Sequence, residues 1–132
     1  MMGSALPPHA ETHDMHRMYR EFLAPSDEEV LEATGKWPDT DEDGARVLTW
    51  REGDGESLVL SYDVLARSVR VRWSRGGEVL LDVFRESATR LSFTSGPSAT
   101  QASVDFHMGA CAGVLEVQVV PHFFVRDRLL FR

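Results

Sequence analysis

Cysteine and long apolar runs are both scarce in this chain. Cys111 is the single cysteine among 132 residues, and one thiol cannot close an internal disulfide. A reducing compartment is therefore expected, and we predict a cytoplasmic location. No apolar run approaches the roughly 20 residues that a membrane span requires. Residues 1–9 also lack the basic and apolar regions of a secretory signal, so we expect no membrane association.

Common catalytic and cofactor signatures are missing as well. The sequence has no glycine-rich phosphate loop, no G-x-S-x-G elbow, no H-E-x-x-H pair and no paired C-x-x-C motifs. Each of these motifs belongs to a particular chemistry, namely phosphate binding, nucleophilic hydrolysis or metal coordination. Their absence removes the common catalytic routes. We therefore predict a protein without a cofactor and, as the leading hypothesis, without enzymatic activity.

The charge is negative and unevenly distributed. The net charge is −7, and residues 1–56 hold fourteen acids and five bases, whereas residues 57–132 hold seven acids and nine bases. The excess of acids in residues 1–56 disfavours nucleic-acid binding, which depends on neutralising the phosphates. It suits a basic protein partner instead. The leading hypothesis is a protein-binding module that masks such a partner, as an immunity-type or accessory protein does.

Length and pattern predict one domain over residues 1–132. Residues 1–8 are expected to be a mobile tail, 9–36 a helical front, 37–44 an acidic loop, and 45–132 an antiparallel β-meander. A first helix is predicted from Pro8 to Leu23 because apolar residues recur there at helical spacing. That stripe comprises Met15, Met18, Tyr19, Phe22 and Leu23.

A second, shorter helix is predicted over Asp27 to Thr34. Ser26 and Glu29 have the spacing of a capping box, in which each side chain accepts from the other residue's backbone amide. Gly35 follows as a residue suited to end the helix. The fold class is therefore α+β and mainly β, with two short N-terminal helices packed on the meander.

Period-2 alternation dominates after Ala45. Strands are predicted at 45–52, 57–62, 67–75, 79–85, 89–95, 101–108, 113–120 and 123–131. The connections are too short for parallel crossovers, so the strands should form an antiparallel curved sheet, barrel or sandwich. The predicted inner face comprises Leu48, Trp50, Leu58, Leu60, Val69, Val71, Trp73, Leu81, Val83, Leu91, Phe93, Val104, Phe106, Leu115, Val117 and Val119.

The clearest hairpin lies around Gly76 and Gly77, which can supply the positive φ of a tight reversal. A strict two-residue loop would place charged residues opposite apolar ones. A bulged three-residue loop over 76–78 instead pairs Val71 with Val83, Trp73 with Leu81 and Arg72 with Asp82. Such cross-strand pairs are each worth up to about 1 kcal/mol, so the bulged register is predicted.

Two groups of residues have partial metal-ligand spacing. Asp39, Asp41 and Asp43, followed by Gly44, resemble the opening of a calcium loop, but the twelfth position is Trp50 instead of a bidentate glutamate. His9, His13 and His16 share one side of the first predicted helix and could clamp a borderline cation. The alternatives are a solvated acidic turn and an exposed polar helix face.

A third candidate set comprises Asp105, His107 and Glu116. If residue 108 lies opposite 113, then Asp105 faces Glu116 with His107 two residues along. Two carboxylates and a histidine could bind a metal or exchange protons, which defines a metal-assisted enzyme as the weaker alternative function. A wet outer face is the simpler interpretation. Cys111 is expected to be a spectator thiol, because nothing fixes His107 against it.

Two further binding modes follow from the strands. Arg70, Arg72 and Arg90 project from the predicted polar face and could grip a partner's carboxylates. The alternatives are a solvated strand face balanced by neighbours such as Asp82 and, as the preferred interpretation, contact with the protein's own acidic loop. A curled meander could also enclose a small apolar ligand, with Trp50, Trp73, Phe93 and Phe106 around it. Exposed edge strands, finally, make a homodimer through sheet extension conceivable.

Overall fold

A computed structural model describes residues 21–131, and the side chain of Phe131 lies outside that description. Within this range the chain is mainly β, with one helix and nine strands. The elements are α2 (Asp27–Thr34), β2 (Asp39–Thr40), β3 (Arg46–Glu52), β4 (Glu56–Asp63), β5 (Ser68–Arg75), β6 (Glu78–Glu86), β7 (Ala88–Ser95), β8 (Thr100–Met108), β9 (Cys111–Val120) and β10 (Phe124–Phe131).

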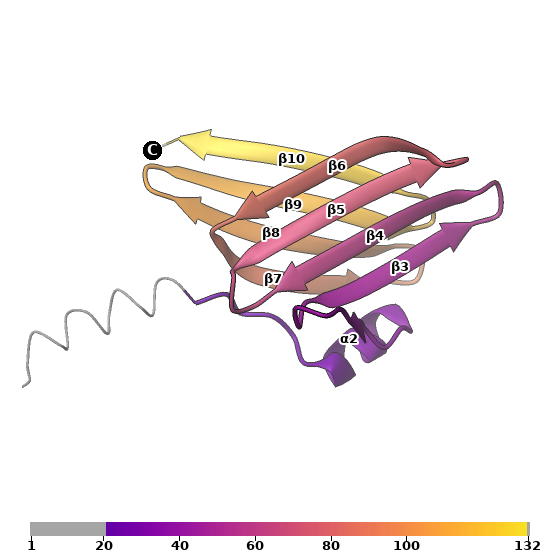
Figure 1. Ribbon diagram of the computed structural model, residues 1–132, viewed down its shortest axis with the longest axis horizontal. Helices are drawn as coiled ribbons and strands as arrows, with labels where there is room; N and C mark the ends of the chain where they lie inside the picture. The colour runs from indigo at the N-terminus through magenta and orange to yellow at the C-terminus, as the bar shows by residue number, and fades with distance from the viewer. Residues whose placement is uncertain (1–20, 132) are drawn as a thin grey trace, which may run out of the picture.

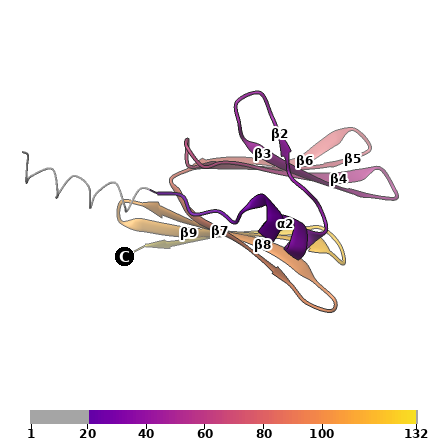
Figure 2. The ribbon, with the colours of Figure 1, turned by 90° about the horizontal axis from the view of Figure 1, so that it is seen from below.

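The strands form two antiparallel sheets. One has five strands in the order β2-β3-β4-β5-β6, and the other has four in the order β10-β9-β8-β7. Figures 1 and 2 show the sheets as two layers, with α2 along one side of them, next to β3 and β7. The predicted antiparallel pairing of consecutive strands holds inside each sheet, and the chain passes from one layer to the other between β6 and β7.

Ser87 makes that passage, with a φ of 69°. The backbone on either side is held by both sheets, because Ala88 N donates to Arg67 O at 3.0 Å and His107 N donates to Ser87 O at 3.1 Å. One flat sheet of all these strands would leave its apolar face in water. Splitting it into two layers lets the apolar faces cover each other.

The core lies between the layers and joins them. Leu48, Leu58, Leu60 and Val71 of the five-stranded sheet belong to one buried cluster with residues of the four-stranded sheet, among them Val104, Phe106, Leu115 and Val117. Twelve of the sixteen residues predicted to face inward are buried. Trp73, Leu81, Val83 and Phe93 are half-buried. Two of these four, Leu81 and Val83, belong to β6, an edge strand that has a neighbour on one side only.

Helix α2 has the predicted bounds. Ser26 Oγ accepts from Glu29 N, and Glu29 Oε1 accepts from Ser26 N, so the capping box is complete. Gly35 ends the helix with a φ of 78°. Val30 is fully buried and anchors the helix on the core. No helix within residues 21–131 is long and apolar enough to cross a membrane.

The first predicted helix is wrong at its C-terminal end, and residues 8–20 of it lie outside the described range. Phe22 and Leu23 are extended instead of helical, and Leu23 pairs with Arg90 of β7 in a parallel bridge. Leu23 N donates to Thr89 O, and Leu91 N donates to Leu23 O, both at 2.9 Å. The unpaired edge of β7 offers these backbone partners, and they outweigh the local helical pattern.

The β5–β6 hairpin has the predicted register. Val71 pairs with Val83, Arg72 with Asp82 and Trp73 with Leu81. However, the backbone feature that produces this register differs from the predicted one. Gly76 and Gly77 form a two-residue turn with φ values of 58° and 84°, and the register shifts beyond Trp73, where Ser74 pairs with Val79. The extra residue is thus Leu80 in the strand, not Glu78 in the loop.

Candidate functional site

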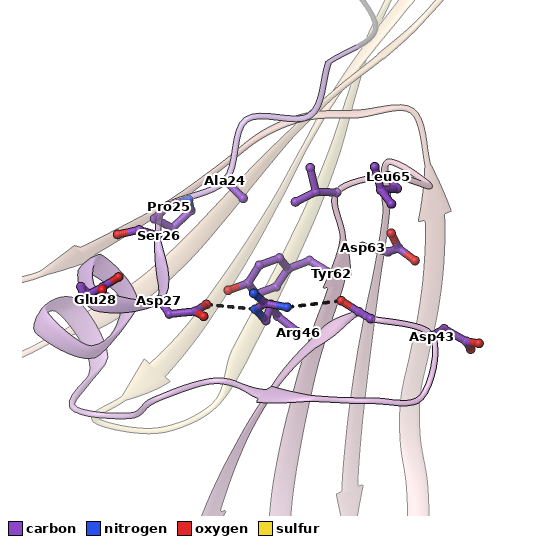
Figure 3. A pocket seen from close by; sticks show the side chains of 12 residues that line it. Ala24, Pro25, Ser26, Asp27, Glu28, Asp43, Arg46, Tyr62, Asp63 and Leu65 are labelled. Atoms are coloured by element: carbon purple, nitrogen blue, oxygen red, sulfur yellow. Dashed lines mark hydrogen bonds and ion pairs between the residues drawn. The ribbon is translucent and has the colours of Figure 1, made fainter.

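Three chain segments meet at one end of the five-stranded sheet. They are the start of α2, the β2–β3 turn and the β4–β5 turn, and together they enclose a pocket of about 450 Å³ (Figure 3). The pocket and the turn beside it carry five carboxylates, which we call the acidic end: Asp27, Glu28, Asp41, Asp43 and Asp63. The uneven charge of the sequence is therefore concentrated in space as well.

Asp27 fixes the helix to the sheet within this pocket. Its Oδ1 accepts from Arg46 Nε at 3.0 Å, and Arg46 Nη1 also donates to Gly44 O at 3.4 Å. The hydrogen bond and the charge of Asp27 raise the pKa of Arg46 above its usual value. Arg46 thus links α2, β3 and the β2–β3 turn, and it neutralises one of the five carboxylates.

Asp41 shapes the β2–β3 turn. Its Oδ1 accepts from Asp43 N at 2.9 Å and from Ala45 N at 3.0 Å, as an aspartate does in an Asx turn. Asp39 lies in β2, opposite Val47, and Asp43 points outward from the turn (Figure 3). Residues 21–131 contain no group of three His, Cys, Asp or Glu side chains that could hold a metal ion. The three aspartates of the calcium hypothesis are thus not brought together.

The β4–β5 turn presents an apolar tip beside these acids. Asp63 Oδ1 accepts from Ala66 N at 3.0 Å and closes the turn. Leu65 is 95% exposed, and Val64 next to it is also exposed. An exposed leucine among carboxylates resembles the arrangement of many protein interfaces, in which an apolar centre is surrounded by a polar rim.

Tyr62 forms the floor of the pocket. Its side chain is 2% exposed, and its hydroxyl has no hydrogen-bond partner among the described residues. In Figure 3 its ring extends from β4 toward Asp27 and the start of α2. Burial raises the pKa of Tyr62 to about 12; the charge of Asp27 adds to that effect and the charge of Arg46 opposes it.

A second hollow, of about 230 Å³, lies next to this pocket. It is lined by Asp41, Asp43, Asp63, Arg70 and Phe84, among others. Asp43, Tyr62 and Asp63 line both hollows, so the two hollows adjoin each other. The acidic end is therefore one continuous surface.

The predicted arginine row is divided between the two sheets. Arg70 donates to Asp82 through Nε at 2.9 Å and Nη2 at 2.8 Å, and Arg72 Nε lies 3.4 Å from Asp82 Oδ2. The hydrogen bond with Arg70 lowers the pKa of Asp82. Arg90 lies on β7 of the other sheet, opposite Asp105. The ion-pair partner of Arg70 and Arg72 is thus Asp82 and not the acidic loop.

The set of Asp105, His107 and Glu116 has a different register from the predicted one. Met108 lies opposite Cys111, so Asp105 faces Val114 and Glu116 faces Ser103. The reason is a two-residue turn at 109–110, which Gly109 permits with a φ of 61°. Glu116 is bound from β10 instead, by Arg128 at 3.3 Å and Arg126 at 3.8 Å. The two carboxylates are not directly opposite each other.

Cys111 and His107 are also kept apart. Cys111 shares the inward side of β9 with Gly113 and Leu115, whereas His107 is exposed on the outward side of β8. A sheet separates the two side chains. His9, His13 and His16 lie outside the described residues.

The four aromatic residues proposed to line a ligand cavity belong to the packed interior. Trp50 and Phe106 are buried in the core cluster, and Trp73 and Phe93 pack against it. Trp73 meets Phe123 edge-on, with 6.5 Å between ring centroids. Phe93 also lines a surface hollow of about 320 Å³ beside α2.

Sequence reasoning did not single out two polar residues on the inner face of β4. Glu56 is buried and accepts from Trp73 Nε1 at 2.7 Å and from Arg75 Nη2 at 3.1 Å. Tyr62 occupies the other end of the same alternation, which runs 56, 58, 60, 62. That alternation was visible in the sequence and places both polar groups on the dry face.

Comparison with known proteins identifies the fold alone. No protein-family model matches this sequence, and no curated protein matches it. The structure is similar to a chain described as "Contact-dependent growth inhibition toxin - immunity protein complex from Klebsiella pneumoniae 342", with a TM-score of 0.73 and 13% sequence identity. The match covers 85% of the present chain and 99% of the other. The present chain therefore shares the fold of a chain from that toxin–immunity protein complex.

Proposed function

We propose that the chain is an immunity-type protein that binds and masks a basic protein through its acidic end. The observation that carries this proposal is the convergence of five carboxylates from three chain segments around the exposed Leu65. Of the two arginines that line the hollows, Arg46 is paired with Asp27 and Arg70 with Asp82. The surface therefore keeps a net negative charge that can steer and orient a cationic partner.

The fold likeness supports the same class of function. The similar chain comes from a complex of a toxin with its immunity protein. An immunity protein has to cover a functional surface of its toxin, and toxins that act on nucleic acid carry basic surfaces for that purpose. The acidic net charge of −7 suits the immunity side of such a pair.

The partner, the compartment and self-association are part of the proposal. We propose a protein partner instead of nucleic acid, because carboxylates repel phosphates. The single cysteine suits a reducing, cytoplasmic location. A homodimer through the edge strands β6 or β10 is an alternative use of the fold, and it would leave the acidic end unoccupied.

Co-purification from the native host tests the proposal. The untagged wild-type chain should carry one protein of high isoelectric point in a stoichiometric amount. A triple variant of the acidic end, Glu28→Gln, Asp43→Asn and Asp63→Asn, should lose it. A control with the same charge change elsewhere, Asp54→Asn, Glu78→Gln and Asp105→Asn, should keep it.

Two outcomes count against the proposal. Equal loss of the partner in both triple variants would show that overall charge, and not the acidic end, drives binding. Absence of any stoichiometric protein partner would reject the protein-binding function itself. If a partner is found, its expression alone should stop growth and co-expression with this chain should restore it, which separates an immunity protein from an accessory subunit.

A further inference from the structure

We propose that the pocket at the acidic end is the socket for one arginine side chain of the partner, an inference that rests on the proposed function. The pocket has a volume of about 450 Å³ and is bounded by α2, the β2–β3 turn and the β4–β5 turn. It is therefore a built hollow with walls on three sides, and not merely a cluster of surface acids.

The charge of the lining selects a cation. Asp27, Glu28, Asp43 and Asp63 contribute four negative charges, and Arg46 contributes one positive charge. Arg46 uses its Nε on Asp27 Oδ1 and its Nη1 on Gly44 O, while the described residues offer no hydrogen-bond donor to Asp27 Oδ2, Glu28 or Asp43. A second cation can therefore enter without competing for the atoms that hold Arg46.

The side chain of Tyr62 gives a second, independent indication that this pocket binds a polar ligand. Tyr62 lines the pocket, and its hydroxyl is buried and has no hydrogen-bond partner among residues 21–131. Leaving such a group unpaired is costly, and a ligand that pairs with it removes that cost. The hydroxyl is covered in the unbound protein, so a ligand pairs with it after a shift of the side chains that cover it.

Guanidinium fits this set of acceptors better than ammonium does. Its five N–H groups lie in one plane and point in different directions, so that one side chain can donate to more than one acceptor of the lining at once. Arg46 demonstrates the fit, because its guanidinium already bridges a carboxylate and a backbone carbonyl there. An ammonium group presents three donors on a compact point charge and reaches fewer of these atoms.

The test uses the full-length protein and a small probe, N-acetyl-arginine amide, observed by two-dimensional NMR. Saturable shifts are expected in the amides of residues 27–28, 43–46 and 62–66 and in the Tyr62 ring. N-acetyl-lysine amide should bind more weakly, and the neutral isostere N-acetyl-citrulline amide should give no saturable shifts in these residues.

Variants assign the binding to named groups. Asp63→Asn keeps the acceptor that closes its turn and should weaken binding of the probe about threefold or more. Asp54→Asn should not change binding, because Asp54 belongs to the β3–β4 turn, which lies at the opposite end of the sheet from the β4–β5 turn (Figure 1). Tyr62→Phe should weaken binding about fivefold, the loss of one hydrogen bond. Arg46→Gln should strengthen binding, because it removes the resident positive charge.

The inference and the proposed function can fail separately. If the probe gives no saturable shifts, or binds equally to wild type and Asp63→Asn, the socket is rejected even where a basic partner binds the acidic end. If the probe binds as expected but the acidic-end triple variant keeps its partner, the socket stands as a guanidinium site and the proposed masking function is rejected.

Discussion

Arg85 on β6 and Asp127 on β10 join the two sheets across the open side of the core. The pair is bidentate, with Nη1–Oδ1 at 2.7 Å and Nη2–Oδ2 at 2.8 Å, and the Arg85 guanidinium carbon also lies 5.6 Å from the centre of the Phe106 ring. Both strands are sheet edges, where inward-facing residues are least covered. The pair therefore links the layers where the apolar core thins.

Asp127→Asn should destabilise the protein by about 1 kcal/mol at neutral pH, because both side chains are partly exposed and solvent screens the pair. Arg85 lowers the pKa of Asp127, so its contribution is present above the ordinary aspartate pKa of about 3.9 and is lost as pH falls through the lowered folded-state value. Urea unfolding across acidic pH should show the wild-type and variant stabilities converging. A constant difference down to the lowest pH would contradict this assignment. Asp105→Asn, on an exposed strand face, is the control.

Glu56 should tolerate glutamine far better than alanine. Glutamine keeps an acceptor for Trp73 Nε1, whereas alanine leaves that half-buried N–H without one, at a cost of about 2 kcal/mol. Denaturant unfolding followed by tryptophan fluorescence measures both variants. Equal stability of Glu56→Gln and Glu56→Ala would show that the hydrogen bond contributes nothing measurable.

Tyr62 should make the fold sensitive to alkali. Its pKa rises from 10.0 to about 12 on folding, so the folded state holds the phenolic proton more tightly than the unfolded chain. The stability from this group is complete below pH 10 and is lost as pH rises through about 12. Tyrosinate absorbance during alkaline titration should show a late-titrating tyrosine in the wild type that is missing from Tyr62→Phe. Titration of all tyrosine near the ordinary pKa would contradict the burial of the hydroxyl.

The β5–β6 turn requires glycine because of its positive φ values, and not because an added side chain would lack room. An added Cβ at Gly77 would meet nothing within 4 Å, but its φ of 84° is strained for any side chain. Gly77→Ala should therefore cost about 1 kcal/mol. Gly53→Ala is the matched control: that turn glycine has equal space and no positive φ, so its change should stay within about 0.5 kcal/mol. Thermal unfolding compares the two, and equal effects would contradict the argument.

Local rules predicted the parts of the fold that depend on neighbouring residues. Ser26 and Glu29 defined the start of α2, and the pairing of Arg72 with Asp82 defined the β5–β6 register. The predicted bulge was misplaced, because two glycines can both adopt positive φ and leave the extra residue to the strand at Leu80. The side chains that face each other across the strands thus determine the register. Either a bulged loop or a bulge within the strand can produce that register.

Partners that are distant in sequence explain the parts of the fold that were not predicted. Leu23 belongs to an apolar helical pattern, yet the open edge of β7, some 65 residues away in sequence, takes its backbone hydrogen bonds. The change of layer at Ser87 has no turn signature of its own in the sequence. The acidic end was foreseen as a charge imbalance, but its pocket was not, since three segments distant in sequence have to meet before Asp27, Asp43 and Tyr62 line one hollow.

Hydrogen exchange of the chain, alone and bound to its co-purified partner, shows whether the acidic end is the binding surface. Amide exchange should slow on binding in residues 26–29, 43–46 and 62–67, with the β3–β4 turn and the β10 edge unchanged. Protection confined to β6, β7 or β10, with the acidic end exchanging as in the free protein, would contradict that expectation.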